Sequence, residues 1–285
     1  MTDSLIVTCP HQGVQLLTIN RPERRNALDQ VTYIALTAAL KAAASGDEVH
    51  AVVIAGAGGC FTAGNDLSDF QEVSKAGGSL AGLDFLRALA DFPKPLVAAV
   101  EGFAVGIGTT LLLHCDLAYA GATARFHLPF VKLGLCAEGA SSYLLPKVAG
   151  TKRASELLLL GEPFSAAEAE AAGIVSRVTE EGTALANALE KAAVLSALPQ
   201  ESLVITKRLL RHTTREAVAE AITLEIEEFR ALRLKPAAQA AFAAFFGNKE
   251  AVMYPRPSTG VPTRPGQREP RRVDCALLPH GGGSA

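Results

Sequence analysis

Short apolar runs in the first half of the chain predict β-strands. In residues 50–56 (HAVVIAG) and 95–100 the apolar residues follow one another without alternation, which is typical of strands buried on both faces. Further β-rich runs lie at Leu5–Cys9, Gln15–Asn20 and Asp116–Ala120. The central runs are therefore expected inside a sheet.

Between these runs the apolar residues recur at helical spacing. A helix is expected from about Asp29, a good N-cap residue, to Ala44. Further helices are expected over Leu80–Asp91 and Thr109–Cys115. Strands that alternate with helices predict an α/β layer fold.

Glycine-rich loops follow two of the predicted strands. They span residues 57–67 and the turn at 102–108. In α/β folds the carboxyl ends of the strands are where ligands bind. These loops are therefore the first candidates for a functional site.

The pattern after Ser165 is mostly helical. Four apolar residues at i, i+4, i+8 and i+11 form one stripe that must face a packing partner. They are Val218, Ile222, Ile226 and Phe229.

The composition changes towards the C-terminal end. From Pro255 to Ala285 proline and glycine are frequent and the apolar periodicity is lost, which predicts disorder. We therefore expect a core that carries the site over 1–195, a helical region over 196–250, and a disordered tail over 251–285.

The overall composition argues against several classes of protein. The 27 basic and 29 acidic residues leave a net charge of −2, so no nucleic-acid surface is expected. No apolar run reaches the roughly 18–20 residues of a membrane span, and the N-terminus does not resemble a signal peptide. The five scattered cysteines favour reduced thiols in a cytoplasmic protein. His114 and His127 lack partners at metal spacing, so no metal site is expected.

Four segments occur in an order that carries a resemblance. They are LTINRPERRNALD (17–29), GGCFTAGNDL (58–67), EGFAVGIGTTLLLHCDLAYA (101–120) and FHLPFVKLGLCAEGASSYLLPKVAG (126–150). Together they resemble the crotonase (enoyl-CoA hydratase/isomerase) superfamily. The resemblance implies a spiral of ββα units, a helical C-terminal trimerisation region, and a homotrimer or dimer of trimers. It also implies an acyl-CoA thioester substrate, with no cofactor beyond the coenzyme A of that substrate.

The chemistry of such a site needs donors for a thioester enolate. Two fixed backbone N–H groups stabilise the negative oxygen, and glycines let the chain approach closely. By resemblance, the donors are the N–H groups of Ala63 and Ile107, the latter at the start of a helix whose dipole adds to it.

The resemblance also implies a set of residues that bind the substrate. Arg24 and Arg25 are expected to meet phosphates of coenzyme A, and the backbone near Ala27 and Asn65 its adenine. Asp66 is expected to brace its loop. The full set is Arg24, Arg25, Ala27, Ala63, Gly64, Asn65, Asp66, Leu67, Gly106 and Phe130.

The number of carboxylates decides between reactions of this family. Hydration uses two, and alignment by the glycines puts Thr110 and Phe130 at their positions, so the two-glutamate hydratase is not encoded. Glu138 lies where peroxisomal-type Δ3,Δ2-enoyl-CoA isomerases have their single base. As a hypothesis, Glu138 moves a proton from C2 to C4 of a 3-enoyl-CoA. An apolar lining would raise its pKa, with Phe103, Phe130, Leu133 and Leu135 as candidates.

Several alternatives stay open from the sequence. Without the resemblance, Glu138 is better explained as an exposed carboxylate at a helix start. Within the family, the alternatives are a hydratase with relocated acids, a dehalogenase or a thioester hydrolase. Outside these, the chain is a scaffold or RNA-binding member without catalysis.

Overall fold

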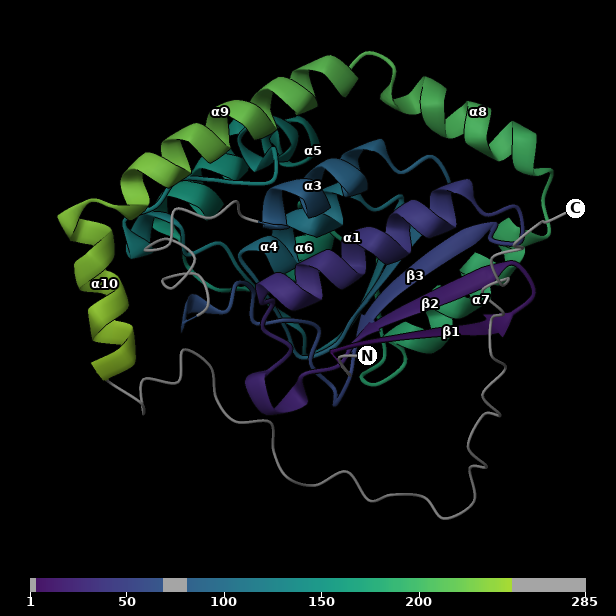
Figure 1. Ribbon diagram of the computed structural model, residues 1–285, viewed down its shortest axis with the longest axis horizontal. Coiled ribbons are helices and arrows are strands. Elements are labelled where there is room, and N and C mark those ends of the chain that lie inside the picture. Colours follow the sequence, from purple (N-terminus) through teal and green to yellow (C-terminus); the bar gives the residue numbers. More distant parts are fainter. Residues whose placement is uncertain (1–3, 69–80, 248–285) are drawn as a thin grey trace, which may run out of the picture.

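The computed structural model describes residues 4–68 and 81–247 (Figure 1). The predicted tail over 251–285 lies outside these residues. A six-stranded sheet has the strand order β1-β2-β3-β4-β6-β9 and is parallel except for the β1–β2 pair. Its strands are β1 (Leu5–His11), β2 (Val14–Ile19), β3 (Ala51–Gly56), β4 (Leu96–Val100), β6 (Leu117–Gly121) and β9 (Arg177–Thr179).

A second, smaller sheet has the order β5-β7-β8. Its strands are β5 (Phe103–Val105), β7 (Arg125–His127) and β8 (Phe164–Ser165). The prediction of a plain turn over 102–108 was therefore wrong, because β5 lies inside it. β4 is followed by β5, and β6 by β7, so successive turns give one strand to each sheet before a helical segment. This is the expected ββα spiral.

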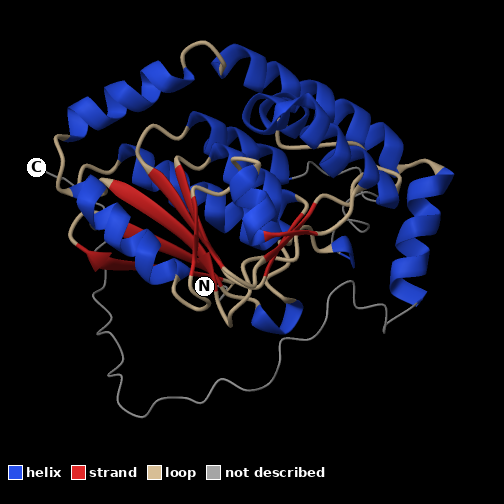
Figure 2. Ribbon diagram, turned by 180° about the vertical axis from the view of Figure 1, so that it is seen from behind, coloured by secondary structure: helices blue, strands red, loops and turns tan. Residues whose placement is uncertain are grey.

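The central strand β3 is buried on both faces, as its uninterrupted apolar sequence predicted. Val53 belongs to the cluster that α7 (Ala184–Ser196) covers with small alanine side chains. Val52 and Ile54 belong to the larger core beneath α1 (Gln30–Ser45) and α3 (Ala81–Asp91). The sheet is thus enclosed between two layers of helix (Figure 2).

The helices of the first half begin close to their predicted positions. Asp29 is the N-cap of α1, and its side chain accepts the Thr32 N–H. The helix predicted over Thr109–Cys115 instead starts at Ile107: α4 (Ile107–Thr110) continues as the 3-10 helix η2 (Leu111–His114). The start moves because Gly106, at φ 54°, turns the chain there.

The remaining helical segments surround the spiral. They are η1 (Pro22–Arg24), η3 (Val131–Leu133), α5 (Ser141–Ser155), the π-helix η4 (Glu156–Leu160), α6 (Ala166–Ala171), α8 (Gln200–Arg211), α9 (Arg215–Arg233) and α10 (Pro236–Gly247). α8 and α9 arch over the body, with α10 turned down at the end (Figure 1). The predicted stripe on α9 is buried against α3 and α5. The division at 195/196 stays a prediction.

Candidate active site

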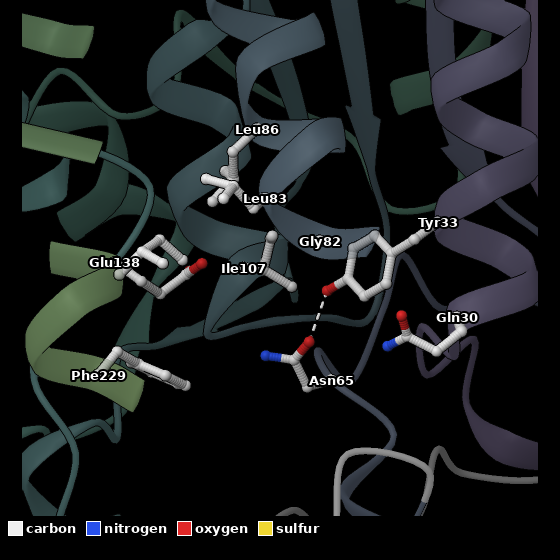
Figure 3. Close-up of a pocket in the computed structure, with 10 residues that line it drawn as sticks. Gln30, Tyr33, Asn65, Gly82, Leu83, Leu86, Ile107, Glu138 and Phe229 are labelled. Carbon is white, nitrogen blue, oxygen red and sulfur yellow. Dashed lines mark hydrogen bonds between the residues drawn. The ribbon is translucent and has the colours of Figure 1, made fainter. Parts of the chain in front are cut away.

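An open cavity lies between α1, α3, α4 and α9 (Figure 3). Leu83 and Leu86 of α3 and Ile226 and Phe229 of α9 form most of its apolar wall. The described residues that line it are Gln30, Tyr33, Asn65, Gly82, Leu83, Leu86, Ile107, Glu138, Ile226 and Phe229. The segments that sequence analysis separated along the chain thus meet around one space.

Glu138 is the ionisable group at the apolar end of this cavity. It is buried, with 3% of its surface exposed, which excludes the exposed carboxylate considered as an alternative. The Thr110 hydroxyl donates to its Oε1 at 2.7 Å. Burial raises the pKa of Glu138 to about 8, the Thr110 bond lowers it, and nearby Glu225 raises it further. Burial had been expected to raise this pKa.

The apolar lining differs from the predicted one. Phe103, Phe130, Leu133 and Leu135 are absent from the cavity wall. Phe130 belongs to the core and lies beside Gly106 instead. Two of the side chains that replace them, Ile226 and Phe229, come from α9. Their periodicity predicted burial, but no local signal connects them with Glu138.

One of the two predicted enolate donors is available. Ile107 lines the cavity and is the first residue of α4, where a backbone N–H has no acceptor within the helix. Among the described residues its N–H donates to no protein acceptor. Its role as a donor therefore stays a prediction that the geometry allows.

The other predicted donor needs a correction. The Ala63 N–H donates to the Arg25 carbonyl at 3.0 Å, so it is committed to the loop. The N–H of Asn65, two residues on, makes no bond to another described residue, and Asn65 lines the cavity. The donor on this loop is better assigned to Asn65. An alignment based on the glycines alone does not establish which residue of this loop supplies the N–H donor.

Gly64 explains how this loop approaches the second glycine-rich segment. Its φ is +87°, and a Cβ there would lie 2.6 Å from the Val105 carbonyl oxygen. Any other residue would push the loops apart. The expected close approach of the two loops is thus built into the backbone.

Arg21 holds the substrate-binding loops together, a role that sequence analysis missed. Its guanidinium pairs with Asp66 and Asp29, each at 3.1 Å, and donates to the Ala27 carbonyl. The predicted bracing role of Asp66 is confirmed. Asn26 adds a second link by donating to the carbonyls of Ala57 and Cys60.

The other predicted substrate-binding residues fall into two groups. Arg24 and Arg25 are exposed and form no ion pair with any residue in the described ranges, so both guanidinium groups are available to a phosphate. The Ala27 carbonyl is already bound by Arg21, and Leu67 packs against the core. Contact of these residues with coenzyme A stays a prediction.

The polar residues set aside in the sequence have structural partners. The Nε2 atoms of His114 and His127 lie 2.8 Å from the carbonyls of Gly139 and Gly161. Asp116 accepts the Leu96 N–H, as expected. Within 4–68 and 81–247, no group of three potential ligands is placed to hold a metal. Over the same ranges no helix has the length and hydropathy of a membrane span.

Comparison with known proteins gives a consistent result. A family model described as enoyl-CoA hydratase/isomerase matches residues 10–252. The chain is 38% identical to enoyl-CoA delta isomerase 2 of Rattus norvegicus over 217 residues, which are 74% of this chain but only 55% of that relative. It is 35% identical to 2,3-dehydroadipyl-CoA hydratase of Escherichia coli (strain K12), covering 80% of this chain and 90% of that one. The crystal structure of an enoyl-CoA hydratase/isomerase from Pseudoalteromonas atlantica T6c matches with TM-score 0.82 and 39% identity, over 86% of this chain and 98% of that one.

Proposed function

The chain belongs to the enoyl-CoA hydratase/isomerase family, and from that premise we propose that it is a Δ3,Δ2-enoyl-CoA isomerase of fatty acid metabolism. One observation carries the proposal: of the described residues that line the cavity, Glu138 alone has a carboxyl group. Hydration as this family performs it would need two carboxylates. At the two positions expected for them the chain has Thr110 and Phe130, neither of which is an acid. A single base suffices for a 1,3-proton shift.

In the proposed mechanism Glu138 acts first as a base and then as an acid. It removes a proton from C2 of a 3-enoyl-CoA, and the negative charge spreads to the thioester oxygen as a dienolate. The backbone N–H groups of Asn65 and Ile107 hydrogen-bond to that oxygen. Glu138 then returns the proton to C4, which leaves the double bond between C2 and C3.

The surroundings of Glu138 suit a group that must both take and return a proton. Thr110 binds Oε1, which leaves Oε2 for the substrate. A pKa of about 8 lies near neutral pH, where neither proton transfer is strongly uphill. The apolar wall from α3 and α9 keeps water from adding to the conjugated product.

The coenzyme A part of the substrate is proposed to bind along the braced loops. The exposed Arg24 and Arg25 would meet its phosphates, and the backbone of residues 63–67 its adenine end. The enzyme would need no other cofactor, so dialysis against a chelator should leave its activity unchanged.

We also propose a cytoplasmic homotrimer or dimer of trimers. The four described cysteines, Cys9, Cys60, Cys115 and Cys136, are all free thiols. Leu209, Leu210 and Leu224 on the outer helices are 64%, 76% and 55% exposed, which suits an interface between subunits. Sedimentation velocity would test this, since a monomer at micromolar concentration would contradict it.

Two substrates and one variant test the proposed reaction. Trans-3-hexenoyl-CoA should gain the absorbance of a conjugated thioester, and Glu138→Gln should lower kcat/KM by ~100-fold or more. The exposed Glu216→Gln serves as control and should match the unmodified enzyme. Loss of absorbance from crotonyl-CoA, with the 3-enoyl substrate untouched, would instead identify a hydratase.

A further inference from the structure

Glu225 of α9 reaches into the loop that carries Glu138. Its Oε2 accepts the Ala140 N–H at 2.6 Å, and its Oε1 accepts the Ser142 N–H at 2.9 Å. Glu225 is buried, with 7% of its surface exposed, and within the described part of the chain it pairs with no cation. A buried carboxylate is costly unless such bonds compensate it, so both oxygens are committed to this loop.

The loop needs an external partner to keep its shape. Gly139 and Ala140 follow one another in the left-handed region, at φ +70° and +56°, which an alanine rarely adopts. α5 then starts at Ser141, and Ala140 offers no side chain to cap it. Glu225 supplies the missing cap from a different helix, about 85 residues further along the chain.

We infer that Glu225 is a positioning residue, which sets the place of the Glu138 carboxyl in the cavity by holding the N–H groups of Ala140 and Ser142. The inference rests on the proposed function of Glu138. α9 also supplies Ile226 and Phe229 to the cavity wall. One helix therefore fixes both the base and the surface against which the acyl chain lies.

The charged and titratable groups around Glu138 are few. Thr110 from α4 binds its carboxyl, and Glu225 from α9 is the nearby acid. His114 from η2 bonds to the Gly139 carbonyl, and burial lowers its pKa to about 4, so it is neutral. The thiol of Cys136 is protonated, because burial raises its pKa to about 11. Among the described residues, Glu225 is thus the one charged neighbour that shifts the pKa of Glu138.

Glu225→Gln keeps the shape of the side chain but places an NH2 group against one of the two N–H donors. The matched control is Glu227→Gln, an exposed acid on the same helix. With the proposed substrate, kcat should fall ~10-fold or more in Glu225→Gln because the base is displaced. KM should stay within about twofold, since the loops assigned to coenzyme A lie elsewhere. The acidic limb of the pH–kcat profile should move to lower pH, because a negative neighbour is lost.

Two results would overturn the inference. One is a kcat and a pH limb in Glu225→Gln that match those of the Glu227→Gln control. The other concerns amide hydrogen exchange of the substrate-free protein. If the inference holds, the amides of residues 140 and 142 exchange faster in Glu225→Ala than in the unmodified protein. Unchanged exchange would refute the positioning role even if no isomerase activity were found. Faster exchange without any activity would leave the positioning geometry standing and count against the proposed reaction alone.

Discussion

The two ends of the 3-10 helix η2 lead to two acids in opposite settings, one at the surface and one buried. After it, Asp116 accepts Lys207 Nζ at 2.7 Å, Arg211 at 3.1 Å and the Leu96 N–H. Before it, Thr110 binds Glu138, which pairs with no cation in the described ranges and faces a second acid. An acid paired with cations is held in its charged form, so it stabilises the fold but is poorly suited to take up and release a proton. The acid left without a cation is the one suited to chemistry.

The largest effect should come from breaking the compensated side. Lys207→Met removes a buried ammonium that binds Asp116 and the Lys94 carbonyl and lies over Phe92, so the free energy of unfolding should fall by roughly 3 kcal/mol. Urea denaturation at pH 7 measures this. Lys191→Met, which breaks an exposed pair with Glu190, should leave the free energy of unfolding nearly unchanged. The kcat of Lys207→Met should stay unchanged. A kcat that fell together with stability would contradict a purely structural role for the Lys207–Asp116 pair.

The uncompensated side should show the opposite sign. The pKa of Glu138 rises from 4.5 to about 8 on folding, so the folded state holds this proton more tightly. The stability from the protonated form is complete below about pH 4.5 and is lost as the pH rises through about 8. Glu138→Gln mimics that form, and should be more stable than the unmodified protein by roughly 2 kcal/mol at pH 8. If the unmodified protein had the same free energy of unfolding at pH 5 and pH 8, ionisation of the buried Glu138 would carry no cost and the prediction would be wrong.

The smallest effect should come from tuning the same carboxyl. Thr110→Val keeps the shape of the side chain but removes the hydroxyl that favours the charged form of Glu138. The acidic limb of the pH–rate profile should move to higher pH, and activity at pH 7 should fall by roughly fivefold. Thr110→Ser, which keeps the hydroxyl, should restore both. A Ser variant as impaired as Val would point to packing instead.

Sequence patterns predicted the features that depend on neighbouring residues. The uninterrupted apolar run of β3, the Asp29 cap and the α9 stripe all follow from local rules, and all three are present. The identity of Glu138 as the candidate base came from its place in a motif. Its burial is a property of the folded chain that the motif alone did not establish.

The errors arose where contacts cross the chain or the register shifts by a residue or two. β5 has three residues, too few to show a period of two. Whether Ala63 or Asn65 can donate to a substrate depends on the Arg25 carbonyl, which already accepts the Ala63 N–H. The cavity wall and the cap on the Glu138 loop come from α9, whose sequence shows an ordinary amphipathic helix.

The distance between Glu138 and its cap also concerns the order in which the protein is made. A ribosome releases the chain from its N-terminal end, so β1 to β6 and Glu138 emerge well before α9. Until then the Ala140 and Ser142 amides have no carboxylate to bind. If Glu138 is the base, as proposed, a nascent or prematurely ended chain carries that group without the cap that positions it, and activity begins only once nearly all of the described fold has been synthesised.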